Sequence, residues 1–261
     1  RDHPMTTPPN PTASPTTPTR RRRALAVGIV GLSALVPVAL PAAAGAEDSR
    51  SAPPTTSEAC KPFTHARERI AGEITRRQAT IVELVASLQA ASDPYGVNGG
   101  QIVALQSSAN GLATLGQQIA TACYPDVASL RADAQKVLFE HRIYALRVPQ
   151  SRVIEAADRL GTARNELQSV ADTLATKVGD DAEARAELDA MNQALADADS
   201  VIGRPPTLTG APADVVALEP AQDLDPTRAA LTAARDAVKA AHQDLASARD
   251  HAKAAVAALR S

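Results

Sequence analysis

The stretch FEHRIYALRVPQSRVIEAADRL, residues 139–160, interrupts a pattern that is otherwise regular. On both sides of it, apolar residues recur every three or four positions, which is typical of amphipathic helices, and the period-two alternation of half-buried strands is absent. Within it, Pro149 lacks a backbone N–H and crowds the preceding helical turn, so we expect a bend there. The sequence therefore predicts an all-α protein with one long helix that is bent near Pro149.

Turn residues divide the chain into five helical runs. The first begins near Pro62 and ends at the turn DPYGVNGG (93–100), and the second ends at CYPD (123–126). The long third run follows, and the fourth starts after GDD (179–181). Asp225 as N-cap and Pro226 in the first turn open the last run. The stripes predicted to be buried are, in chain order, Ile70, Ile74, Ile81, Leu84 and Leu88; Ile102, Leu105, Leu112, Leu115 and Ile119; Val127, Leu130, Ala134, Val137, His141, Tyr144 and Val148; Ile154, Ala157, Leu167, Leu174 and Val178; Leu188, Met191, Leu195, Ala198 and Ile202; and Leu231, Ala234, Val238, Ala241, Leu245, Ala248, Ala252, Ala255 and Leu259.

The lengths of these runs suggest two antiparallel, coiled-coil-like three-helix bundles that share the long helix. The predicted domains are an N-terminal bundle at residues 60–148 and a C-terminal bundle at 149–261. A single up-and-down bundle of five helices is the alternative. Residues 204–224 are Pro-rich and irregular, but Val215, Val216 and Leu218 are apolar enough to pack back on the bundle.

The first part of the chain has the features of an export signal. Residues 1–19 are rich in Pro and Thr and are expected to be disordered. Residues 20–46 combine four arginines, an apolar segment and small residues before Glu47, so we predict a signal peptide cleaved after Ala46. Residues 47–59 are expected to be a disordered linker. An uncleaved signal anchor is the alternative, and in either case the rest of the chain is predicted to be secreted or associated with the cell envelope.

Composition argues against several kinds of ligand. The formal net charge of the whole chain is −2, and removal of Arg20–Arg23 would make it more negative, which disfavours binding to phosphates. Three tyrosines, two phenylalanines and no tryptophan offer few rings on which bases or sugars could stack. We therefore expect no nucleic-acid partner, and a membrane contact only through the signal or anchor segment.

Cys60 and Cys123 are the two cysteines of the chain. An oxidising compartment favours a bond between them, and an antiparallel hairpin of the first two helices would bring them to the same end. Free thiols or a cross-linked dimer are the alternatives.

The sequence contains no recognisable catalytic, metal or cofactor motif. A helical metal site usually carries a Glu three residues before a His or two histidines four apart, and neither pattern occurs. Haem ligation by His141 and Met191 is disfavoured because the two lie far apart along the expected rod. His141 and Tyr144 are interpreted as core residues, while Glu140, Arg142 and Arg147 are expected to be solvated. We therefore predict a protein that is not an enzyme and has no cofactor.

The runs HRIYALRVPQSRVIEAADRL and ALEPAQDLDPTRAALTAARDAVKAAHQDLASARDHAKAAVAALR resemble a group of uncharacterised, exported, alanine-rich helical proteins of actinobacteria. The resemblance supports export and helicity and supplies no functional residues.

These features favour a non-catalytic exported helical protein that acts as an envelope-associated scaffold or protein-interaction module. Its partner would be another protein or a second copy, held through the helical seams. A bundle that binds a small apolar ligand near Pro149 is the alternative, and an enzyme using Glu140, His141 and Tyr144 is a third hypothesis.

Overall fold

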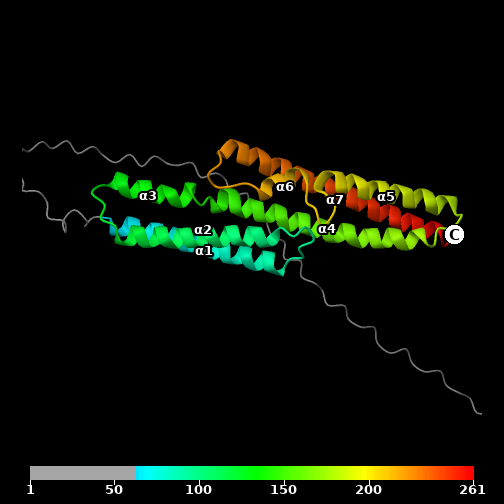
Figure 1. Cartoon of the computed structure of the whole chain (residues 1–261), viewed down its shortest axis with the longest axis horizontal. Helices are drawn as coiled ribbons and strands as arrows, with labels where there is room; N and C mark the ends of the chain where they lie inside the picture. The colour runs from blue at the N-terminus through cyan, green and yellow to red at the C-terminus, as the bar shows by residue number, and fades with distance from the viewer. Residues whose placement is uncertain (1–62) are drawn as a thin grey trace, which may run out of the picture. The chain divides into compact units, whose positions relative to one another are not determined.

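The computed structural model describes residues 63–261, and within them the chain is all-α (Figure 1). No strand occurs in this part of the chain, so the predicted fold class is confirmed. The elements are α1 (Thr64–Ala90), α2 (Asn98–Thr121), α3 (Val127–Phe139), the π-helical turn η1 (Ile143–Arg147), α4 (Val148–Ala175), α5 (Ala182–Ile202), α6 (Gly210–Val216) and α7 (Leu224–Ala258).

Several predictions concern residues outside 63–261. They are the disordered segment 1–19, the signal peptide 20–46 with its cleavage between Ala46 and Glu47, the linker 47–59, and Cys60. All of them stay predictions. Among the described helices, none is both long and apolar enough to cross a bilayer.

The long bent helix of residues 127–175 is present, but its break does not lie at Pro149. Asp126 caps α3 by accepting a hydrogen bond from the Ser129 backbone N–H at 2.8 Å, and α3 ends at Phe139. The helical hydrogen bonding is interrupted at Glu140–Arg142, where Arg142 adopts a left-handed conformation with φ 40°. Pro149 is the second residue of the helix that follows.

Pro149 nevertheless explains why the chain is irregular before it. In a regular α-helix its ring would collide with the carbonyl four residues earlier. The preceding turn instead has π-helical bonds, in which Arg147 N–H donates to the Arg142 carbonyl at 3.3 Å and Val148 N–H to that of Ile143. The wider turn shifts the register, so that Ile143, Leu146 and Arg147 are buried. The predicted stripe through Tyr144 is therefore wrong at that residue, which is 49% exposed.

One hydrophobic core joins α1, α2, α3 and the first turns of α4. Figure 1 shows α1 and α2 side by side beneath α3. The predicted stripes of the first two helices are buried or partly buried here. Leu105 and Leu112 are fully enclosed, whereas Val127 at the start of α3 is half exposed and does not belong to the core.

A second core joins the later part of α4 to α5 and α7. The five residues predicted for α5 are all buried, and Gly203, with φ 85°, ends that helix. Most predicted α7 positions are buried as well, and six of its buried residues are alanines, whose small side chains let the backbones approach closely. The predicted N-cap of α7 is displaced by two residues: Asp223 precedes the helix in place of Asp225.

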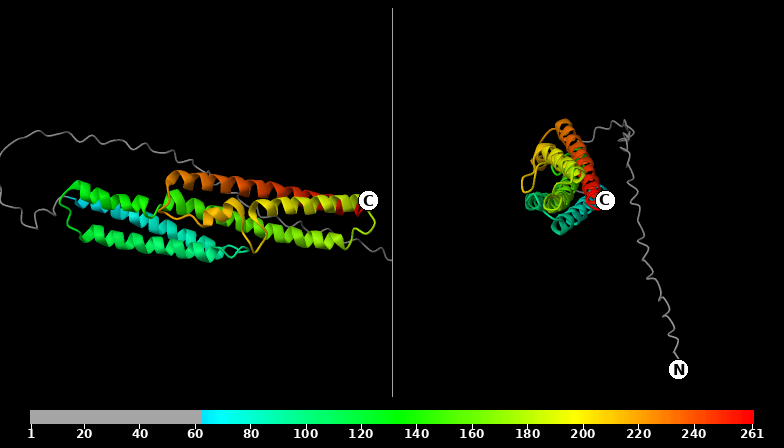
Figure 2. Two further views of the ribbon diagram at one scale, coloured as in Figure 1. Left: turned by 45° about the horizontal axis from the view of Figure 1, so that its top comes forward. Right: turned by 90° about the vertical axis from the view of Figure 1, so that its right-hand side faces the viewer.

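The Pro-rich segment 204–224 packs on the bundle, as Figure 2 shows. Val215 and Leu218 are buried in a small core that they share with Leu146 of η1 and Leu231 of α7. The sequence did not predict α6 within this segment. The division into domains at residues 148 and 149 stays a prediction.

Candidate functional site

The three residues considered for catalysis do not form a cluster of reactive groups. Glu140 is exposed, and His141 is half-buried against α2. A Cβ atom placed on Gly111 would lie 2.4 Å from Cε1 of His141, so the ring rests directly on that glycine. Burial lowers the pKa of the His141 imidazole, which favours its neutral form near neutral pH.

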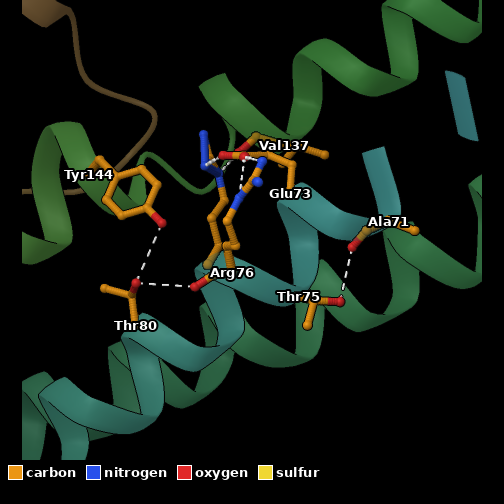
Figure 3. Close-up of polar contacts among 8 residues, drawn as sticks. Ala71, Glu73, Thr75, Arg76, Thr80, Val137 and Tyr144 are labelled. Atoms are coloured by element: carbon orange, nitrogen blue, oxygen red, sulfur yellow. Dashed lines mark hydrogen bonds and ion pairs between the residues drawn. The ribbon is translucent and has the colours of Figure 1, made fainter. Parts of the chain in front are cut away.

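Tyr144 lies on the outside of the bundle, over α1 (Figure 3). Its hydroxyl is 3.4 Å from Oγ1 of Thr80, and the Arg77 guanidinium lies 4.9 Å from the centre of its ring. Arg77 is buried, pairs with Glu73 and donates from Nε to the Val137 carbonyl at 3.3 Å. These contacts tie α1 to α3 and to the segment after the break, so we interpret them as structural.

Arg147 was expected to be solvated, and this is wrong, because it is only 4% exposed. Its Nη1 donates to Gln150 Oε1 at 3.0 Å, and its Nη2 lies 3.3 Å from Glu219. Gln150 in turn donates to the Val215 carbonyl at 2.7 Å. This hydrogen-bonded network fills the interior near Pro149 and fixes the 204–224 segment. Its members are polar residues on helical faces, so periodicity alone could not find them.

Residues considered for haem ligation are also separated. Met191 is fully buried in the core of α4, α5 and α7, whereas His141 packs on α2. Among residues 63–261 there is no group of three or more His, Cys, Asp or Glu side chains placed to hold a metal ion.

An open groove runs between α4 and α7. Three cavities of about 360, 400 and 530 Å³ follow one another along it, and neighbouring cavities share Leu160, Ala163, Val170 or His242 in their walls. Its floor is apolar and includes Leu160, Leu167, Leu174, Leu245 and Leu259. We call this feature, from Ala156 to Lys177 on α4 and from Arg235 to Arg260 on α7, the α4–α7 groove.

The edges of the α4–α7 groove carry mainly positive charge. Six basic side chains line it, and Glu166 is the acidic residue among its lining residues. Arg159 is 3.7 Å from Glu155, and Arg249 is 3.7 Å from Asp250. These long ion pairs neutralise the positive charges of the two arginines only in part. The basic residues are Arg159, Lys177, Arg235, Lys239, Arg249 and Arg260.

Comparison of the chain with protein-family models, with curated proteins and with solved structures gives no match. The α4–α7 groove therefore has to be interpreted from its own chemistry. Its apolar floor supplies non-directional affinity, and its basic edges favour an occupant with negative charge on both flanks. The sequence predicted an apolar stripe along α7. It could not show that the surface between α7 and α4 is left open to solvent.

Proposed function

We propose that this protein is a non-catalytic interaction module whose α4–α7 groove binds an acidic amphipathic helix of a partner protein. The observation that carries the proposal is the combination of an apolar floor and basic edges along the same two helices. Helix-in-groove recognition uses an apolar helical stripe as its anchor. Acidic residues on both sides of that stripe would face the basic edges.

The dimensions of the α4–α7 groove suit such an occupant. Its α4 wall extends from Ala156 to Lys177, which corresponds to about 33 Å at 1.5 Å per residue. A helix of about 22 residues therefore fits along it. Val170 is 40% exposed on this wall and gives a partner side chain direct access to apolar surface.

A second copy of the chain is a less suitable occupant. A two-fold symmetric contact through the α4–α7 groove would place like surfaces against each other. The basic edges of one copy would then face those of the other, and like-charge contacts of this kind oppose association. Self-association through this face is an outcome that the experiment below detects.

The proposal also covers the location and the architecture of the protein. We infer an exported protein, secreted or associated with the cell envelope, built from two three-helix bundles that share the bent helix. The resemblance to exported alanine-rich helical proteins of actinobacteria supports the same view. The apolar-ligand alternative placed its site near Pro149, where Gln150 and Arg147 now fill the interior with polar groups, so we favour the groove.

The binding test uses two designed helical peptides of about 22 residues. Both carry leucine and alanine at three-four spacing, and one has glutamate on its flanks where the other has lysine. Fluorescence anisotropy should show at least tenfold tighter binding of the glutamate peptide. Reversing the groove charges in the variant R235E/K239E/R249E should invert this preference. The control R69E/R131E/R228E makes the same change of charge at exposed positions outside the groove and should leave it unchanged.

The natural occupant can be identified with a photo-crosslinking residue at position 170, with position 82 as the control. Val82 is 67% exposed on α1, outside the groove. We expect position 170 to give an adduct that maps to an acidic amphipathic helix and position 82 not to give it. A lipid adduct, an adduct between two copies of this chain, or equal peptide binding by the charge-reversed variant would overturn the proposal.

A further inference from the structure

The stretch from Pro94 to Pro125 contains no charged residue, although Asp, Glu, Lys and Arg make up 21% of the chain. It includes the whole of α2. One side of α2 is buried in the core, and the opposite side is exposed. Surface helices of globular proteins usually carry charged residues among the polar ones on their outer side. The exposed side of α2 instead combines polar and apolar groups without any charge.

The exposed side of α2 belongs to a larger surface that it shares with α1. On α1, Thr80 points toward Tyr144 of η1 (Figure 3), and Arg77 contacts α3 on the same side. The opposite side of α1 lies beside the exposed side of α2, because the two helices are neighbours (Figure 1). We call this common surface the neutral face. Its exposed residues include Thr75, Val82 and Ala86 of α1 and Val103, Asn110 and Gln117 of α2.

Apolar groups project from the neutral face and also line a hollow in it. Val82 is 67% exposed and Val103 is 65% exposed. At the end of the face a cavity of about 360 Å³ opens between α1 and α2, with Ile74 and Ile119 in its wall and Gly116 beside them. Exposed apolar surface of this kind favours association, because a partner that covers it removes it from water.

Charged groups border the neutral face but do not enter its centre. Arg67 and Glu68 line the end of the hollow, and the Arg67 guanidinium is held by the Ala120 and Ala122 carbonyls at 3.0 and 2.6 Å. Glu83 is exposed on the flank of α1. The centre of the face therefore offers no ion pair to a charged partner, and the cores of protein interfaces are depleted of charge in the same way.

A second copy of the chain is the partner that suits these properties. In a two-fold symmetric contact each surface meets itself, so a charged face would be opposed by like charges. The neutral face avoids this repulsion, unlike the α4–α7 groove with its basic edges. Asn110 and Gln117 also favour self-association, since a side-chain amide has both donors and an acceptor and can pair with another amide.

The size of the neutral face is sufficient for a dimer. The part of α2 from Gly99 to Ala120 is about 33 Å long, and two adjacent helices are about 20 Å wide. The outline of the face is therefore about 650 Å². Standard interfaces bury about 800 Å² of accessible surface on each partner, and side-chain relief makes the accessible surface larger than the outline. The two areas are thus comparable.

We propose that two copies of this chain associate through their neutral faces and form an antiparallel four-helix arrangement of α1 and α2. The short connection between α1 and α2 makes the two helices antiparallel within each copy. A two-fold axis in the plane of the interface makes each helix antiparallel to the helix that it faces in the other copy. The α4–α7 groove is formed by other helices, so the dimer does not depend on the proposed function.

Analytical ultracentrifugation of the full chain at micromolar concentrations tests the proposal. We expect a dimer whose affinity changes by less than about twofold between low and high salt, since no ion pair holds it. The variant V82E/V103E should dimerise at least tenfold more weakly while it keeps its helical circular dichroism, because it places like charges against each other. The control V127E/V170E makes the same changes at exposed valines outside the neutral face and should dimerise normally.

Photo-crosslinking provides a second measurement that needs no charged substitution. A photoreactive residue at position 82 should give an adduct between two copies of the chain, and one at position 127 should not. An adduct between copies at position 82 supports the dimer, whereas such an adduct at position 170 counts against the groove as a site for another protein.

The two proposals can fail separately. The groove variant R235E/K239E/R249E should still dimerise, and V82E/V103E should still bind the glutamate peptide. A chain that stays monomeric, an unchanged dimer in V82E/V103E, dissociation of the dimer by salt, or a position-82 adduct with another protein or a lipid in place of a second copy would each overturn the dimer proposal.

Discussion

Arg164 and Asp199 form a bidentate ion pair between α4 and α5, with Nε–Oδ1 and Nη2–Oδ2 distances of 2.8 Å. The Arg164 side chain is 5% exposed and that of Asp199 is 19% exposed. The two residues are 35 positions apart, so no helical spacing rule connects them.

Replacement of Arg164 by Ala should destabilise the fold by about 3 kcal/mol, because it leaves the Asp199 carboxylate partly buried without its partner. Urea unfolding followed by circular dichroism measures this loss. In R164K the charge is kept and the fork geometry is lost, so an intermediate loss is expected. A variant R164K as stable as the unmodified chain would show that the second hydrogen bond contributes nothing.

Tyr144→Ala should cost only about 1 kcal/mol, since the side chain is half exposed and its main contact is the cation–π interaction with Arg77. A tyrosine in the core, as the sequence predicted, would cost roughly 3–5 kcal/mol. Denaturant unfolding separates these two values. A loss of stability in the higher range would indicate that Tyr144 is a core residue after all.

Gly161→Ala should destabilise the protein although alanine favours helices. A Cβ atom there would lie 2.7 Å from Cε2 of Tyr95, a ring that is held by its hydrogen bond to Gly203. We expect a net loss of about 1–2 kcal/mol, since overpacking outweighs the gain in helix propensity. Gly72→Ala in α1 is the control: nothing lies within 4 Å of its Cβ position, so melting should show a gain of up to about 1 kcal/mol.

Asp158→Asn should stabilise the protein at pH 7. The pKa of Asp158 is raised from 3.8 to about 6 by burial, so the folded state binds more protons than the unfolded state between these values. The stability that depends on this group is therefore greatest below about pH 4 and is lost as the pH rises to about 6.

The variant D158N lacks this dependence, and at pH 7 it should gain up to about 3 kcal/mol. Urea unfolding at intervals from pH 4 to pH 8 compares the two proteins. Parallel stability curves across this range would contradict a buried, ionised Asp158.

Reduction of the predicted bond between Cys60 and Cys123 should lower stability by about 4 kcal/mol in the chain-entropy model. Arg67 supports the proximity that this bond needs, because its guanidinium donates to the Ala120 and Ala122 carbonyls at 3.0 and 2.6 Å and so joins the start of α1 to the end of α2. Hydrogen exchange should reveal earlier opening of α2 than of α5 after reduction. Equal opening of α2 and α5 would contradict two separate bundles. As a control, the stability of the variant C60S/C123S should not change when reductant is added.

Much of the helical pattern was predictable because burial of one helical face imposes a three-four spacing on the sequence. Leu188, Met191 and Ile202 in α5 follow this spacing and are all buried. Helix ends were predictable where turn residues fix them, as at CYPD (123–126) between the end of α2 and the start of α3. The start of α7 was misplaced by two residues because Asp223 and Asp225 are both acceptable N-terminal residues.

The irregular part of the long helix was only partly predictable. Pro149 signals that regular hydrogen bonding fails nearby, but the chain absorbs the defect upstream, through a π-helical turn and the left-handed Arg142. The resulting shift exposes Tyr144 and buries Arg147. The position of the irregular turn depends on the neighbours against which each turn can pack. Those neighbours are α1, α6 and α7, which lie far away in the sequence.

By itself, then, the sequence determined that residues 63–261 form amphipathic helices and which positions in most of them are apolar and inward, because those properties follow from local hydrogen bonding and periodicity. Only the tertiary structure decided that the α4–α7 groove stays open with basic edges and that Asp158 lies unpaired against the end of α1. Both depend on which helices are in contact. The sequence of one helix does not specify which polar or apolar face of another helix will lie against it.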